Sequence, residues 1–546
     1  MAGNNACLAH SQIVGAGESW TSMVKLGYNL KKTASIYQHC EKKLRKLTKE
    51  WIKMGGSFKV PESMHGSDED SDSGSEDDDN DDRGSSKGKS SNLSKSRSLA
   101  ERLADLDMGG SASSSSGDRI DNTRLDIKQL DALRDDQRMV LDTRKGIQED
   151  YELSSLRIGL EFGIGAFNLV VSLIPASFQK ATEVMGLPGD RNKGLRLLQK
   201  AAATNHPRAP ISFVMLLQYH TVIMGLLPYG DQHGKEAKQL LDKVQAQWKN
   251  GSIFRIMLSR YERYEGMLSK SLDTLVRNSK TDPYDISNRG CNQRLRNFMI
   301  DELGWCYLLQ GEFDKAAEQF GKLFKDTVWF KPFYACLQAA CLWEAGDKQH
   351  EAASSVLREL PQLVAGKKQT GPLEQYGLRM ANEFVASSQA PLFPALELAA
   401  VYNGFQHMDK PSLERHMDAI EDVQKKPQSG EGTSKAGGHG TFEIRWNNTS
   451  KLLCRFLLGH CHKALGDKHK AQDCFRHVVK NSENVPGNFV PYSCYELAAL
   501  LLQDDINSQE GLSLLDKAVA FPPHEFQPRL KFVVSEMTKI YRPLNK

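Results

Sequence analysis

Cysteine and histidine side chains, the usual ligands of zinc in proteins, gather in one stretch near the C-terminal end of the sequence. Its members are Cys454, His460, Cys461, His462, His469, Cys474 and His477. The stretch has neither a Cys-x-x-Cys pair nor a matching histidine pair, so its spacing argues against a metal site. We expect these residues to pack within helices or to face solvent, with metal binding as the alternative.

Other motifs that carry chemistry are weak or missing in the sequence. Gly163-Ile164-Gly165 resembles the start of a dinucleotide-binding fingerprint, but no third glycine follows and no strand is expected before it. The sequence contains no phosphate-binding loop, no Gly-x-Ser-x-Gly elbow and no His-Glu-x-x-His helix. We therefore predict a protein that is not an enzyme, with no catalytic, cofactor-binding or metal-ligating residues.

The strongest pattern is a helical hairpin that occurs twice with identical spacing. The first copy is Leu303, Gly304, Tyr307, Gly311, Ala316 and Phe320, and the second is Leu458, Gly459, His462, Gly466, Ala471 and Phe475. Small residues where two helices cross, a glycine turn and one aromatic anchor are typical of a tetratricopeptide repeat. A single hairpin cannot bury its apolar face, so the pattern predicts further copies stacked beside it.

Degenerate copies extend the pattern along the chain. One surrounds Gly346, and a fourth lies in 495–523, where Gly511, Leu515 and Ala518 fit the second helix. The second-helix spacing also recurs upstream, in Gly194, Leu198, Ala201 and in Ala237, Leu241, Val244. The predicted fold class is all-α, an α-solenoid of irregular tetratricopeptide-like helix hairpins.

An acidic, serine-rich segment divides the chain. Residues 66–117 have few apolar side chains, so we predict a disordered insert between an N-terminal helical segment (1–65) and a helical repeat body (118–546). Ser67, Ser73 and Ser75 each have an acid three residues later, a pattern favoured by acid-directed kinases, and they are candidate phosphorylation sites. A simple solvated loop is the alternative. A flexible loop is expected at about 425–440.

Charge and cysteine usage narrow the function classes. Ten of the acids lie in 68–82, so the formal charge of +3 leaves +13 on the rest of the chain. The basic body has no aromatic and basic stripes, and we expect no nucleic-acid partner. The ten cysteines have no paired spacing and no signal peptide opens the chain, which favours a reducing, cytoplasmic location rather than secretion.

One apolar, glycine-rich segment, 158–174, is not explained by the repeat. A membrane span needs about 20 apolar residues, and here Glu161 and Asn168 interrupt the segment before Pro175 ends it. A buried helix is the favoured interpretation, because Gly159 and Gly163 allow close helix packing. Contact with a membrane surface and a true span are the alternatives.

The concave face of such a solenoid is formed by the first helices of the hairpins. Their register places Asp301, Trp305, His460 and Lys463 on that face, and these are the candidate residues for binding a peptide segment or a helix of a partner protein. The alternative for Trp305 is burial between neighbouring repeats, since tryptophan is on average highly buried.

Several blocks together resemble the tetratricopeptide repeat protein 39 family over most of 150–545. The blocks are 163–169 with 189–191, 304–311 with 315–317, 333–342, 366–368 with 372–374, 396–398 with 402–405, and 491–498. The resemblance implies a non-catalytic helical repeat protein. Some members are linked to lipid metabolism through another protein's ubiquitination, or to lipid droplets, and a fungal relative is tied to inclusion-body clearance and the mitochondrial outer membrane.

Two functions follow from the residues and the resemblance together. The first is a scaffold or adapter that binds proteins through the helical groove, connected with lipid metabolism or protein quality control. The second is a peripheral protein of the mitochondrial outer membrane or of lipid droplets, which would use the basic body and the glycine-rich helix. We favour the adapter.

Overall fold

The computed structural model describes residues 35–37, 39, 40, 42–47, 49, 135–174, 189–227, 230–248, 251–276, 293–327, 330–365, 367, 370–387, 391–425, 434, 435, 443, 444, 446–483 and 485–541. For 135–151, 230–232 and the strand residues, the description is of the backbone only. The predicted insert at 66–117, with Ser67, Ser73 and Ser75, lies outside the described residues. So does most of the predicted N-terminal segment and of the loop predicted at 425–440.

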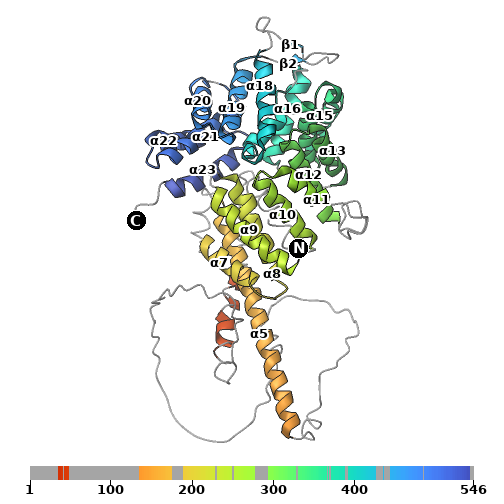
Figure 1. Cartoon of the computed structure of the whole chain (residues 1–546), viewed down its shortest axis with the longest axis vertical. Helices are drawn as coiled ribbons and strands as arrows, with labels where there is room; N and C mark the ends of the chain where they lie inside the picture. Colours follow the sequence, from red (N-terminus) through yellow and green to blue (C-terminus); the bar gives the residue numbers. More distant parts are fainter. Residues whose placement is uncertain are drawn as a thin grey trace.

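Helices form nearly all of the described chain and stack side by side into one body, from which α5 extends (Figure 1). The first half comprises α5 (Asp135–Ser172), α7 (Arg191–Ala202), α8 (Ala209–Gln218), the π-helix η1 (Tyr219–Ile223), the 3₁₀-helix η2 (Met224–Leu226), α9 (Gly230–Gln247), α10 (Ser252–Tyr264), α11 (Leu268–Val276), α12 (Gln293–Leu309) and α13 (Phe313–Asp326).

The second half begins at α14 and ends with α23. It comprises α14 (Lys331–Glu344), η3 (Asp347–Gln349), α15 (His350–Val364), α16 (Pro372–Ser387), α17 (Pro394–Val401), η4 (Phe405–His407), α18 (Lys410–Lys425), α19 (Asn448–Ala464), α20 (Lys468–Lys480), α21 (Phe489–Asp504), α22 (Gln509–Ala520) and α23 (Gln527–Tyr541). Two short strands, β1 (Ser434–Lys435) and β2 (Glu443–Ile444), pair antiparallel with Ser434 opposite Ile444. The predicted all-α solenoid is confirmed, with this strand pair as a small addition.

The two hairpins that carry the repeated motif, α12–α13 and α19–α20, show why the motif has its spacing. A Cβ atom on Gly304 would lie 2.5 Å from the ring of Phe320, and one on Gly459 would lie 2.7 Å from the ring of Phe475. Both phenylalanines are fully buried. The first helix therefore has a glycine where the aromatic ring of the second helix packs, and a larger residue there would separate the helices.

The degenerate copies share features with the two regular hairpins, namely the conformation of the turn glycine and the burial of the second helix. The turn glycines Gly311 and Gly466 have φ angles of 75° and 84°, and Gly346 has a φ of 103°, all in the left-handed region that glycine tolerates. Leu515 of α22 and Leu198 of α7 are buried, as their place in the second-helix spacing predicts. The repeat thus runs from α7 to α22 with irregular connections.

The glycine-rich segment is the C-terminal part of α5, where it crosses α7. A Cβ atom on Gly165 would lie 3.1 Å from the carbonyl oxygen of Gly194, and a Cβ on Gly194 would lie 2.7 Å from the backbone nitrogen of Leu169. On another side of α5, a Cβ on Gly163 would meet the ring of Tyr37. The glycines therefore let α7 and the helical residues near Tyr37 approach the α5 backbone directly.

The α5–α7 crossing gives a stability prediction. Gly194→Ala places a methyl group against the backbone of α5 and is expected to lower the free energy of unfolding by about 1–3 kcal/mol through overpacking. Chemical denaturation measures this loss.

Gly159→Ala is the matched control, because Gly159 lies on α5, the other helix of this crossing, and nothing lies within 4 Å of its added Cβ. We expect this variant to equal or exceed the wild type in stability, since alanine favours a helix over glycine by about 1 kcal/mol. Equal losses in the two variants would contradict the close crossing.

Candidate partner-binding face and its occupant

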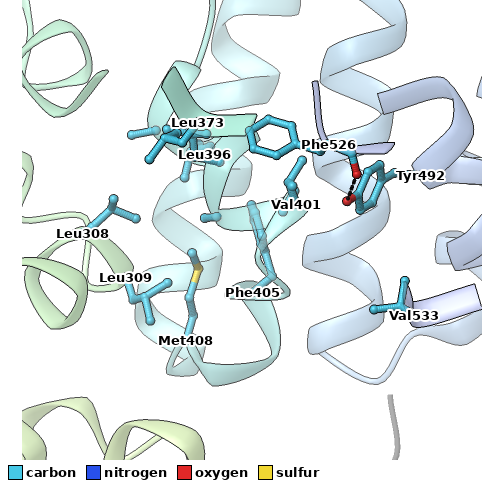
Figure 2. Packing of buried hydrophobic residues seen from close by; sticks show 14 of the residues in the cluster. Leu308, Leu309, Leu373, Leu396, Val401, Phe405, Met408, Tyr492, Phe526 and Val533 are labelled. Carbon is cyan, nitrogen blue, oxygen red and sulfur yellow. Dashed lines mark hydrogen bonds between the residues drawn. The ribbon is translucent and has the colours of Figure 1, made fainter. Parts of the chain in front are cut away.

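The first helices of the repeat hairpins face a segment of the same chain. This central segment, residues 393–408, contains α17 and η4, and α17 packs against α14, α19 and α21. All eight residues of α17 are buried. Figure 2 shows Leu396, Val401 and Phe405 between Leu308 of α12 and Tyr492 of α21. The surface on which a tetratricopeptide array usually binds a partner is thus covered from within.

The N-terminal end of the central segment has its polar groups satisfied. The backbone N–H of Leu396 donates to the Glu344 carboxyl at the end of α14, at 2.8 Å. The Tyr376 hydroxyl of α16 donates to the buried Glu397 carboxyl at 2.8 Å. Burial raises the pKa of Glu344 to about 8, although backbone N–H groups of α17 favour its charged form.

The C-terminal end is held by residues from distant parts of the chain. The Arg529 guanidinium donates to the carbonyl oxygen of Val401 at 2.6 Å and lies 4.9 Å from the centre of the Tyr402 ring. The Asn403 side chain donates to the carbonyl oxygen of Gly225 at 3.1 Å. Helix α23 thus holds the central segment from one side, and the η2 region holds it from another.

Trp305 lies on the predicted face and contacts the central segment. Its ring centroid is 5.6 Å from that of Tyr402 and 6.1 Å from that of Phe320, and the side chain is partly buried. The role of Trp305 in binding a partner stays a prediction. The aromatic group that it meets belongs to the same chain.

His460 is buried, with 2% of its surface exposed. Its ring centroid lies 5.4 Å from that of Phe405 in the central segment, 4.6 Å from Phe456 and 5.3 Å from Phe475. The prediction that His460 offers a contact to a partner does not hold in this arrangement, because aromatic rings enclose the imidazole. Burial lowers its pKa to about 4, so the ring is neutral near pH 7.

Asp301 and Lys463 connect neighbouring first helices. Asp301 of α12 is hydrogen-bonded to Tyr334 of α14, and its pKa is raised to about 6 by burial and by the nearby Glu302. Lys463 of α19 forms an ion pair with Glu496 of α21. Burial alone would raise the pKa of Glu496, but the positive groups around it, Lys463 first among them, together lower it. Both residues therefore contribute to packing between repeats.

A buried ionic cluster joins α10 to α12. The Glu302 carboxylate is 1% exposed and accepts from Arg260 at 3.0 Å and from Arg263. Burial alone would raise its pKa, but the two guanidinium groups hold it down at about 2. The cluster is internal and fully paired, which is typical of a structural role rather than of a reactive site.

The cysteine and histidine stretch at 454–477 does not assemble into a ligand set among the described residues. Cys454, Cys461 and Cys474 are buried, and burial raises the pKa of the Cys454 and Cys461 thiols to about 12. Such thiols are protonated and inert. This agrees with the expectation that the stretch packs within helices.

One group of metal-ligating side chains is brought together elsewhere in the described residues. It consists of His220 on η1, with His233 and Glu236 on α9. The sequence did not predict this group, because His220 is 13 positions from His233. The only local signal was the i, i+3 spacing of His233 and Glu236, which places both on one helix face.

Comparison with protein families agrees with the architecture. The family model for Iml2/tetratricopeptide repeat protein 39 matches residues 2–465. The chain belongs to this family. A general tetratricopeptide repeat model matches residues 454–485, the hairpin of α19 and α20. No solved structure matches the chain. The family predicted from the sequence is thus confirmed, and its match includes the N-terminal region that precedes α5.

The contact between Trp305 and the central segment yields a stability test. Trp305→Ala removes the ring that packs on Tyr402 and Phe320, and we expect a loss of about 3 kcal/mol in the free energy of unfolding. Thermal and chemical denaturation measure this, with Val385→Ala on an exposed position of α16 as the control. A Trp305→Ala melting temperature equal to that of the control would mean that the ring does not support the central segment.

Glu344 yields a pH prediction. Its pKa is raised from 4.5 to about 8 in the folded state, so between these values the folded chain keeps a proton that the unfolded chain releases. The contribution of Glu344 to stability is therefore complete below pH 4.5 and falls as pH rises to 8, by at most about 1.4 kcal/mol per pH unit.

Glu344→Gln keeps a carbonyl oxygen at this position and removes the titration. Relative to the wild type, the variant should gain stability steadily from pH 5 to pH 8 in denaturation curves. Glu414→Gln, which removes an exposed carboxylate from α18, controls for the loss of one charge. A constant difference between wild type and Glu344→Gln over this range would exclude a buried, neutral Glu344.

Proposed function

We propose that this protein is a non-catalytic adapter that binds other proteins on the outer surface of its repeats. Tetratricopeptide arrays commonly serve as protein-interaction scaffolds, and membership of the family supports that general role. The observation that carries the finer proposal is the burial of the central segment against the first helices. With that face covered, the second helices present the surface that is left for a partner.

The most suitable outer surface is α20. It presents six exposed basic or histidine side chains on one helix: Lys468, His469, Lys470, Arg476, His477 and Lys480. Lys468 and Arg476 contact Asp504 and Glu510 of the next hairpin. Exposed pairs of this kind contribute little to stability, so a partner's carboxylates can replace them at small cost. An acidic peptide or helix is therefore the partner chemistry that fits α20.

Affinity purification of the full chain from cells, with mass spectrometry, tests this proposal. Lys468→Glu/Lys480→Glu reverses two charges on α20, and Lys410→Glu/Lys425→Glu reverses two exposed charges on α18 as the matched control. We expect a discrete protein partner in the wild type and the control, reduced at least about tenfold in the α20 variant, which corresponds to about 1.4 kcal/mol.

Each outcome decides one part of the proposal. If the wild type, the α20 variant and the control recover the partner equally and have equal melting temperatures, α20 is not the binding surface. Recovery of no discrete partner by the wild type would count against the adapter function itself. A cytoplasmic location and a connection with lipid metabolism or protein quality control stay predictions.

A second function is favoured by the exposure of α5. Two described stretches, Glu152–Ser172 and Ala209–Leu226, are long and apolar enough to cross a membrane by length and composition, a test that core helices of soluble proteins also pass. Ala209–Leu226 is 61% buried, as expected for a core helix, whereas Glu152–Ser172 is 33% buried. The apolar side of α5 therefore supports peripheral contact with a mitochondrial outer membrane or a lipid droplet.

Flotation of the full chain with anionic liposomes tests this second function. Leu156 is 38% exposed on α5, and Leu156→Asp should release the protein from the liposome fraction if α5 makes the contact. Val385→Asp, at a 61% exposed position on α16, is the control for a new surface charge. A wild-type chain that stays in the unfloated fraction would exclude direct lipid binding.

A further inference from the structure

A buried histidine on a π-helical turn faces two ligand-type side chains of the next helix. His220 lies on η1, and His233 and Glu236 lie one turn apart on α9. The Nδ1 atom of His220 is 3.1 Å from Nδ1 of His233 and 3.0 Å from Oε2 of Glu236, and the remaining pair, His233 Nδ1 and Glu236 Oε2, is 4.0 Å apart.

The local backbone explains how these side chains meet. Helix α8 continues into η1, where the backbone widens to a π-helical turn, a feature often found at functional sites. His220 is 2% exposed there, and its ring lies 5.0 Å from that of Tyr219. The side chains of His233 and Glu236 are 19% and 39% exposed. The cluster thus has a buried floor at His220 and opens to solvent beside α9.

The three facing atoms lie within 4.8 Å of one another, close enough for a single ion to contact them all. Zinc binds imidazole nitrogen and carboxylate oxygen at about 2 Å. Two imidazoles and one carboxylate suit zinc better than calcium or magnesium, which prefer oxygen ligands.

The hydrogen bonding of the cluster depends on where the imidazole protons lie, and the two Nδ1 atoms can share only one proton. A divalent cation would contact all three facing atoms at once. The Arg191 guanidinium, whose charge acts on His233, is paired with Glu536 at 2.6 Å, so its charge is compensated.

We propose that His220, His233 and Glu236 bind one zinc ion. The ion would tie the η1 turn to α9 and so fix the part of the chain whose Gly225 carbonyl holds Asn403 of the central segment. This site does not depend on the adapter function or on any partner of α20.

Metal binding by the full chain tests the site. The purified protein is stripped with a chelator and titrated with zinc against a chromophoric chelator, and bound metal is counted by mass spectrometry. We expect one zinc per wild-type chain. His233→Ala and Glu236→Gln should each weaken its affinity by about 100-fold or more, because removal of a ligand costs more than loss of a supporting hydrogen bond.

The control and the spectroscopy separate this site from other histidines and from cysteines. His477→Ala, at an exposed position of α20, should keep the wild-type affinity. X-ray absorption of the zinc complex should show nitrogen and oxygen neighbours at about 2.0–2.1 Å, with no sulfur at about 2.3 Å. Zinc should also raise the melting temperature of the wild type and of His477→Ala, but not that of His233→Ala.

Three results would overturn the proposal. In the first, the wild type binds zinc no more tightly than His233→Ala does. In the second, the bound ion has sulfur neighbours. In the third, His233→Ala and the His477→Ala control lose the same amount of zinc affinity. Because both replaced ligands are partly exposed, their variants are expected to fold, and equal melting temperatures of the metal-free proteins verify this.

Discussion

The packing of the central segment against the first helices is the interaction on which the rest of the structure depends. Fully burying a Leu or Val side chain stabilises a fold by about 1.5–3 kcal/mol, and α17 buries Leu396, Leu398 and Val401 together. No hairpin could supply these contacts alone. The central segment therefore replaces the partner peptide that a helical repeat groove often binds, and it joins the repeats before α17 to those after it.

Polar pairing fixes the position of this apolar core. Glu344 and Arg529 satisfy backbone groups near the two ends of α17, while Glu302 and Glu496 pair with cations between neighbouring helices. A buried carboxylate without a partner is costly, so each pair penalises a shifted arrangement of the helices. The interior that binds the central segment is thus selective as well as apolar.

The fold was largely predictable, and the occupied face was not. Gly304 with Phe320, and Gly459 with Phe475, have a spacing that only close helix pairs explain, so the hairpins followed from local sequence. His460 has the right register for the inner face, but local spacing cannot reveal that Phe405, 55 positions earlier, packs against its ring. The proximity of His220 to His233 and Glu236 could not be predicted for the same reason, because a π-helical turn determines which residues His220 contacts. Contacts between distant segments depend on how the whole array closes.

The pair formed by Arg191 and Glu536 makes the packing of the first repeats depend on the last helix of the chain. An ordinary solenoid can fold repeat by repeat, because each repeat contacts only its neighbours. Here α7 meets α23 across 345 positions of sequence, and α23 also holds Val401. During synthesis the apolar central segment emerges before α19, α21 and α23 exist to cover it. The growing chain therefore exposes a hydrophobic helix until its last helices are synthesised, and such exposed surface favours aggregation before folding is complete.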